Sequence, residues 1–210
     1  MRRVAVLTAA AGIWLATIAS GVGQIIANGS FETPDISSNT FLYDPSGAVW
    51  VFTGSSGIID APGGAFFGEP APDGSQYAFL QFDPTNAGVF SQTITLSLAG
   101  TYELSYLVAG RPNNGGGAAG NLPYQILLDS TVIASDSTTT GQPFTSKVFD
   151  FSATTGSHTL TFETAAGASG DNTAFFDMIA IQAVPEPGSA VLFLSSLIAA
   201  AVTRQIRTRR

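Results

Sequence analysis

Strict alternation of apolar and polar residues restricts the fold of this 210-residue chain more than any other feature. In the segment VFSQTITLSLAG, Phe90, Ile94 and Leu96 share one parity, and serine and threonine occupy the other. The segments TYELSYLVAG and SHTLTFET alternate in the same way. A period of two with β-branched and aromatic residues indicates half-buried antiparallel strands. No stretch of the middle of the chain keeps a helical period for more than two turns.

Short strand candidates follow one another along the chain, with Gly, Pro, Asn and Ser between them. Strands at this spacing predict an all-β fold with two antiparallel sheets, a β-sandwich, and most simply a jelly roll. A body of about 160 residues is long enough to bury one substantial core. The candidates are 24–28, 48–53, 56–60, 75–82, 89–98, 101–109, 123–129, 131–136, 144–151, 157–164 and 173–183, of which the second and third could be one strand.

The charges are distributed unevenly. Residues 24–184 contain fourteen acidic residues against Arg111 and Lys147, a formal charge of −12. Such a body repels the phosphates of nucleic acids and anionic lipid surfaces, so we expect no nucleic-acid partner. The chain has no cysteine, which excludes disulfides and a thiol nucleophile.

The N-terminus has the layout of a secretory signal peptide. Arg2 and Arg3 precede an apolar stretch from Val4 to about Ala19, and small residues follow. This order predicts a signal helix in residues 1–23, cleaved between Ala19 and Gln24, and therefore an exported protein.

The C-terminus, residues 185–210, combines a proline-rich start, an uncharged apolar run and a basic end. The run Gly188 to Thr203 is slightly shorter than the roughly 20 residues that span a bilayer as a helix. Arginines after it would stay in the cytoplasm, so the body would face the other side. A buried core helix is disfavoured because the run has no polar face.

A Pro-Glu-Pro triplet at 185–187 precedes the apolar run, and arginines follow it. In this order the tail resembles a PEP-CTERM sorting signal. The resemblance implies a transient inner-membrane intermediate, cleavage by an exosortase, and a final place at the cell surface, in the outer envelope or in the matrix of a Gram-negative bacterium. A plain permanent anchor is the alternative. The residues that match the pattern are Pro185, Glu186 and Pro187 in the triplet, and Arg204, Arg207, Arg209 and Arg210 in the basic end.

Residues 25–183 carry a second resemblance. The ordered set ANGSFETP, APDGSQYAFLQ, FSQTITLSLAGTYELSYLVAGR, GSHTLTFET and DNTAFFDMIAI is similar to the galactose-binding-like jelly-roll domains of carbohydrate-binding modules. The resemblance implies a galactose-binding-like sandwich that attaches to polysaccharide.

Asp177 suggests a metal. Alternation in AFFDMIAI predicts that Phe175, Asp177, Ile179 and Ile181 share one face. A buried carboxylate needs a cation or several donors, and calcium prefers carboxylate and carbonyl oxygens. The alternatives are a position at a sheet edge or pairing with Lys147. The resemblance to carbohydrate-binding modules implies one structural calcium held by Glu32 and Asp177, with carbonyls near Asn28 completing its shell.

Sugar binding needs an aromatic platform and a few planar polar groups. Strand patterning places Trp50 and Tyr77 in the core. The residues nearer to loops are better candidates for exposed ligand contacts: Tyr43, Phe67, Arg111, Asn113, Asn114 and Tyr124.

Catalytic signatures are weak. His158 is the single histidine, it follows a Gly-Ser turn, and no GxSxG elbow occurs, so we expect a surface histidine and no enzyme activity. The sequence therefore predicts an exported, non-catalytic protein that associates with polysaccharide. The alternatives are a polysaccharide-active enzyme and a purely structural envelope or matrix protein without a ligand.

Overall fold

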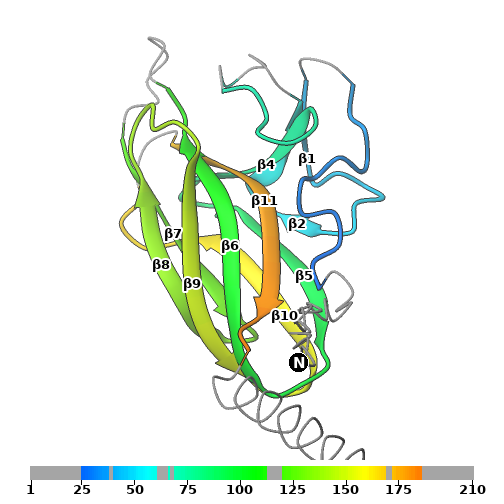
Figure 1. The fold of residues 1–210 in the computed structure, drawn as a ribbon. Coiled ribbons are helices and arrows are strands. Elements are labelled where there is room, and N and C mark those ends of the chain that lie inside the picture. Colours follow the sequence, from blue (N-terminus) through cyan, green and yellow to red (C-terminus); the bar gives the residue numbers. More distant parts are fainter. Residues whose placement is uncertain are drawn as a thin grey trace, which may run out of the picture.

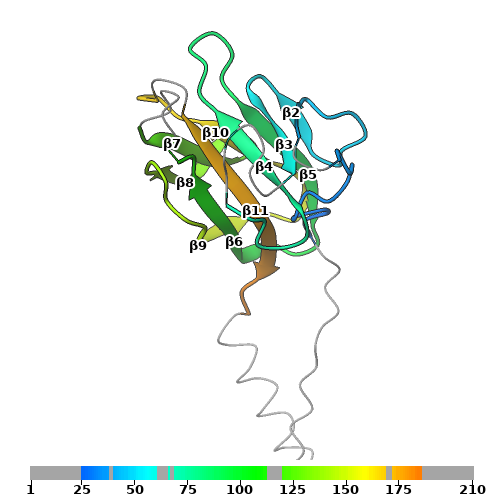
Figure 2. The same cartoon turned by 90° about the horizontal axis from the view of Figure 1, so that it is seen from above.

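Two antiparallel sheets, packed face to face, form the body of the molecule (Figures 1 and 2). The structure is a computed structural model that describes residues 25–37, 40–60, 66, 69–112, 120–168 and 172–185. Within these residues, no helix combines the length and hydrophobicity needed to cross a membrane. The expected signal helix and tail helix lie outside them.

The six-stranded sheet has the order β1-β3-β4-β11-β6-β9, and the five-stranded sheet has the order β2-β5-β10-β7-β8. Most connections carry the chain from one sheet to the other, as in a jelly roll, so the predicted sandwich is confirmed. The strands are β1 (Phe41–Tyr43), β2 (Val51–Thr53), β3 (Ser56–Asp60), β4 (Gln76–Gln81), β5 (Val89–Leu96), β6 (Gly100–Gly110), β7 (Leu122–Leu128), β8 (Thr131–Thr138), β9 (Thr145–Ala153), β10 (Gly156–Thr164) and β11 (Thr173–Ala183).

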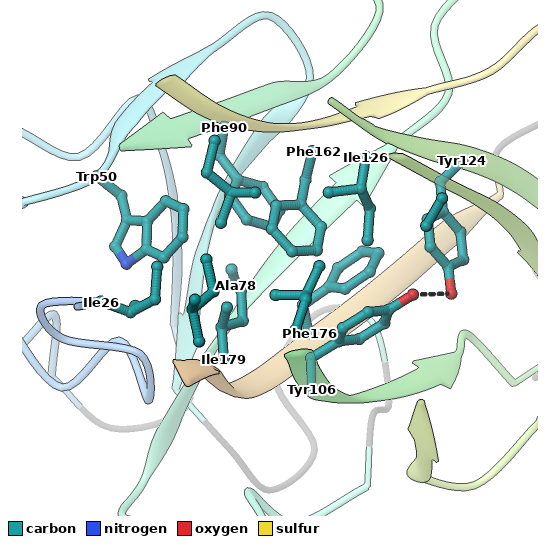
Figure 3. Packing of buried hydrophobic residues seen from close by; sticks show 14 of the residues in the cluster. Ile26, Trp50, Ala78, Phe90, Tyr106, Tyr124, Ile126, Phe162, Phe176 and Ile179 are labelled. Atoms are coloured by element: carbon teal, nitrogen blue, oxygen red, sulfur yellow. Dashed lines mark hydrogen bonds between the residues drawn. The ribbon is translucent and has the colours of Figure 1, made fainter. Parts of the chain in front are cut away.

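The core between the sheets is rich in aromatic rings (Figure 3). Phe90 of β5 and Phe162 of β10 stack with their centroids 4.8 Å apart, and Phe176 of β11 meets both at steep angles. Trp50 is buried beside them, as predicted, and its indole Nε1 donates to the Asn28 carbonyl at 3.0 Å. Offset and edge-on rings of this kind gain energy beyond the area that they bury.

Tyr124 belongs to this core, and its predicted exposure is wrong. The residue is 1% exposed, and its hydroxyl lies 3.0 Å from that of Tyr106 (Figure 3). Strand β7 begins at Leu122, so Tyr124 is the third residue of an alternating strand and points inward with Ile126. Burial raises the pKa of the Tyr124 phenol far above its ordinary value.

One further expectation fails near the N-terminus. Residues 25–28 form bends instead of a strand. The backbone of Ala27 bonds to the Gln92 side chain in place of a neighbouring strand: the Gln92 amide nitrogen donates to the Ala27 carbonyl, and the Gln92 side-chain oxygen accepts from the Ala27 amide, both at 2.8 Å. Strand β1 was not predicted. Segments 48–53 and 56–60 are not one strand, since β2 and β3 belong to different sheets.

Candidate functional site

The outer face of the six-stranded sheet carries a second apolar layer. In β4, Ala78 and Leu80 point into the core, so Tyr77 and Phe79 point away from it. Tyr77 is thus buried as expected, although it lies in this second layer. We call the cluster the outer layer; its members are Ile59, Phe66, Tyr77, Phe79, Ala109 and Phe175, with Ala71 and Phe144 packed against it.

Phe41 and Tyr43 of β1 form the accessible edge of this layer, and we call this pair the aromatic rim. Each is 38% exposed, and their rings meet at 90° with centroids 5.7 Å apart. The Tyr43 ring also packs edge-on against Phe79 at 5.1 Å, and its hydroxyl donates to Oε1 of Gln81. Packing and a hydrogen bond therefore fix an exposed aromatic surface beside a planar amide.

Arg111 lies on the same face, just after the end of β6. Its guanidinium carbon lies 4.8 Å from the centroid of the Phe66 ring, within the range of a cation–π contact. Its backbone amide donates to the Thr173 carbonyl at 3.0 Å. The strand order brings Arg111 within two strands of Gln81, since only β11 separates β4 from β6.

The structure thus brings together two of the six predicted ligand contacts, Tyr43 and Arg111, on one face. Tyr124 lies in the core, and Phe67, Asn113 and Asn114 lie outside the described residues. Phe41 and Gln81 were missed. The parity of Gln81 with Tyr77 and Phe79 could have indicated its place on this face, but the three-residue β1 gives no comparable signal.

Glu32 and Asp177 converge on the loop before β4. Glu32 Oε1 accepts from the backbone amides of Ser75 at 3.0 Å and Gln76 at 2.8 Å. Asp177 Oδ2 accepts from the amide of Asp73 at 3.1 Å. Gly74 fits here because it has a φ of +67° and because a Cβ on it would lie 2.3 Å from the Glu32 carboxyl carbon.

A bulge in β11 determines where Asp177 points. The register with β6 shifts between Asp177 and Ala180, and Met178 has a φ of +53°. Phe175 belongs to the outer layer, but Ile179 and Ile181 belong to the core. The predicted single face for these residues is therefore wrong: Asp177 follows Phe175 to the outer face, and the bulge turns the rest of the strand inward.

Asp177 is fully buried, and its electrostatic surroundings are acidic. Burial raises the pKa of its carboxyl group to about 7, and the nearby charges of Asp73 and Glu32 add to this effect. Hydrogen bonds from the amides of Asp73 and Met178 act in the opposite direction. A cation bound near a buried carboxyl group would favour its ionised form.

The carbonyl of Asn28, predicted in the calcium shell, and Lys147, the alternative partner of Asp177, both have other partners. The Asn28 carbonyl accepts from the Trp50 indole at 3.0 Å and from the Phe31 amide at 3.1 Å, and the Asn28 side chain bonds to the Thr33 backbone. Lys147 pairs with Asp136 at 2.6 Å, which disfavours its pairing with Asp177. Across the described part of the chain, no three Asp, Glu, His or Cys side chains are grouped closely enough to hold a metal ion, so a calcium would rest on Glu32, Asp177 and backbone oxygens.

The sorting triplet and the basic end cannot be placed, since Pro185 is the last described residue. Glu186, Pro187, Arg204, Arg207, Arg209 and Arg210 all lie outside the described residues.

A family model described as HpiC1-like, HpiC1 cyclase, matches residues 24–175. The chain belongs to the HpiC1-like family. The match covers the jelly roll up to Phe175, and thus Glu32, Tyr43, Gln81 and Arg111. No curated protein sequence matches the chain.

Solved structures with a similar fold include carbohydrate-binding modules and an adhesin domain. The K1 adhesin domain of Lys-gingipain from Porphyromonas gingivalis W83 is 14% identical, with a TM-score of 0.51 over 74% of this chain and 96% of that one. At this identity the likeness shows the fold alone. The module TmCBM61, solved with β-1,4-galactotriose, is 15% identical, with a TM-score of 0.47 over 77% of this chain and 99% of the module.

A third structure is much longer than this chain. The isomalto-dextranase of Arthrobacter globiformis T6, solved with panose, is 13% identical, with a TM-score of 0.45 over 63% of this chain. The chain spans about a fifth of that enzyme, 21% of its length.

Proposed function

We propose that this HpiC1-like protein is an exported, non-catalytic protein that binds polysaccharide through the aromatic rim. The observation that supports the proposal is the exposure of Phe41 and Tyr43 at the edge of an otherwise buried outer layer. A pyranose ring has an apolar face that packs on aromatic rings, and its hydroxyl groups bond to planar polar groups such as the Gln81 amide. The acidic body favours a neutral glycan over an anionic one.

Affinity gel electrophoresis of the full-length chain tests this proposal. Gels would contain galactan, xylan, mannan or dextran as neutral polysaccharides, and alginate or pectin as acidic ones. We expect retardation on at least one neutral polysaccharide. Tyr43→Ala should weaken it about tenfold, which corresponds to the loss of one good aromatic contact.

Two variants make the gel assay specific. Tyr43→Phe keeps the ring and loses only the hydroxyl, so most of the retention should remain. Leu98→Ala removes another exposed apolar side chain, outside the rim, and should change nothing. An absence of retention on all six polysaccharides would contradict the proposal and favour the purely structural alternative, and release of reducing ends would favour a polysaccharide-active enzyme.

We further propose one structural calcium bound by Glu32 and Asp177. Its support is the fully buried Asp177 carboxyl group next to the charges of Asp73 and Glu32. Because calcium would bind only the folded state, it should raise the melting temperature relative to a chelator. Glu32→Gln and Asp177→Asn should each abolish this difference, and equal melting temperatures of the wild type under both conditions would exclude the site.

The proposed route to the cell surface is cleavage of the tail near the Pro185-Glu186-Pro187 triplet by an exosortase. Its support is the resemblance of residues 185–210 to a sorting signal. Mass spectrometry of the mature protein should find a C-terminus near this triplet, and a mature protein that keeps Arg210 would favour the permanent anchor.

Family membership favours cyclisation of a small molecule as a second candidate function. Without a bound cation, burial raises the pKa of the Asp177 carboxyl group to about 7, near the value that suits a general acid at neutral pH. The two candidates differ in their products: a binding protein leaves its ligand unchanged, whereas a cyclase yields a new compound detectable by mass spectrometry.

A further inference from the structure

The Thr173 hydroxyl is an anomaly in the outer face. Thr173 is 2% exposed, and among the described residues its Oγ1 is the buried side-chain polar atom without a hydrogen-bond partner. In the sheet the residue lies opposite Gln81 of β4, and its carbonyl accepts from the Arg111 amide. A buried hydroxyl without a partner destabilises a fold, so its presence requires an explanation.

Strand geometry places this hydroxyl among the groups of the candidate site. Ala174 and Phe176 belong to the core and Phe175 to the outer layer, so Thr173 points to the outer face. Its strand lies between β4, which carries Gln81, and β6, which Arg111 follows. Thr173 therefore lies between the amide that holds Tyr43 and the guanidinium that covers Phe66.

We propose that Thr173 Oγ1 is a specificity contact that bonds to one hydroxyl group of the bound glycan. The proposal rests on the proposed function and adds a protein group that would recognise one hydroxyl group of the glycan. A threonine hydroxyl donates one hydrogen bond and accepts others, which matches the dual character of a sugar hydroxyl. Binding requires the hydroxyl to become accessible, and we assign this step to a movement of the half-buried Arg111, whose backbone amide bonds to the Thr173 carbonyl.

The variant Thr173→Val separates a ligand contact from a structural role. Valine has nearly the same shape but no hydroxyl group, so it removes the polar atom that has no partner. We expect the melting temperature to rise, because a buried group without a partner is lost. On the neutral polysaccharide that retards the wild type, we expect retention to weaken about tenfold, which is the usual size of one lost hydrogen bond.

Thr161→Val is the matched control. Thr161 is a half-buried threonine of β10, and it points to the outer face of the opposite sheet, since Leu160 and Phe162 point into the core. This variant should leave retention unchanged, which shows that a threonine-to-valine change does not disturb binding in general.

The possible outcomes distinguish a failure of this inference from a failure of the proposed function. Weaker retention of Thr173→Val together with an unchanged or higher melting temperature supports the contact. Equal retention of Thr173→Val and wild type overturns the contact and leaves the proposed function intact. A wild type that binds none of the six polysaccharides overturns the proposed function, and this inference with it.

Discussion

His158 joins two turns through both nitrogens of its ring. Nδ1 lies 2.9 Å from Asp129 Oδ2, after the end of β7, and Nε2 lies 2.9 Å from the carbonyl of Thr154, between β9 and β10. A carboxylate and a carbonyl only accept hydrogen bonds, so the arrangement is complete only when both nitrogens carry a proton. The hydrogen bond to Asp129 therefore raises the pKa of His158, and the carbonyl of Thr154 adds to the effect.

The first prediction concerns this pKa. NMR titration of the imidazole should give a pKa above the usual value of about 6.5. Asp129→Asn should lower it, since the hydrogen bond to a carboxylate is the larger cause. Because the folded-state pKa is raised, the stabilisation is present below about pH 6.5 and is lost as the pH rises through the folded-state pKa. A wild-type pKa at or below 6.5 would contradict the arrangement.

Single residues were predictable where they belong to a segment with a clear strand-like pattern. Trp50, just before β2, and Tyr77, near the start of β4, were correctly assigned to buried positions. The burial of Tyr124 was not predicted, because the Gly- and Pro-containing segment before it indicates a loop, whereas β7 already begins two residues earlier, at Leu122. Thr173 could not be singled out, since a missing hydrogen-bond partner is a property of the assembled face.

At the scale of the elements, the β11 bulge determines the site more than any strand boundary does. It keeps Asp177 on the outer face and returns Ile179 and Ile181 to the core. Segment 173–183 was predicted with its correct bounds. The bulge within it was not predictable, because the residue in the left-handed conformation is a methionine, a residue type that does not indicate this conformation in a sequence. Ideal alternation therefore predicted the burial of Asp177 and assigned it to the wrong face.

The second prediction follows from the conformation of Met178. A non-glycine residue in the left-handed region costs energy, and asparagine tolerates this conformation better than methionine. The Met178 side chain is 46% exposed, so its replacement sacrifices little apolar burial. Met178→Asn should therefore stabilise the fold by up to about 1 kcal/mol in urea denaturation.

Met178→Ala serves as the control, because alanine keeps the backbone cost and should give no gain. A stability of Met178→Asn at or below that of Met178→Ala would mean that the bulge carries no such cost.

At the scale of the whole molecule, the six-stranded sheet buries its inner face and part of its outer face. Its inner face packs against the five-stranded sheet, and part of its outer face lies under the outer layer. Alternation predicted the first face well. It could not predict the second, because an antiparallel sheet that faces water on one side and a sheet covered by loops differ only in contacts between distant segments. The aromatic rim is exposed because the outer layer ends at β1, the edge strand of this sheet.

The third prediction asks whether the two layers unfold together. Phe176 and Phe175 are adjacent and fully buried, but Phe176 packs among core rings such as Phe162, whereas Phe175 packs against Phe66 and Tyr77 of the outer layer. Truncation of a buried phenylalanine to alanine costs about 3–5 kcal/mol when the cavity cannot close. We expect Phe176→Ala to show this full cost, since the rings around it belong to strands of both sheets.

Phe175→Ala should cost less, about 2–3 kcal/mol, because the side chains above it come partly from a covering segment that can settle into the cavity. Urea denaturation measures both changes, and hydrogen exchange locates them. If the layers unfold as one unit, the amides of β4 and β10 lose protection equally in Phe175→Ala. If only β4 and its neighbours lose protection, the outer layer opens separately from the core, and the rim then rests on the less stable side of the sheet.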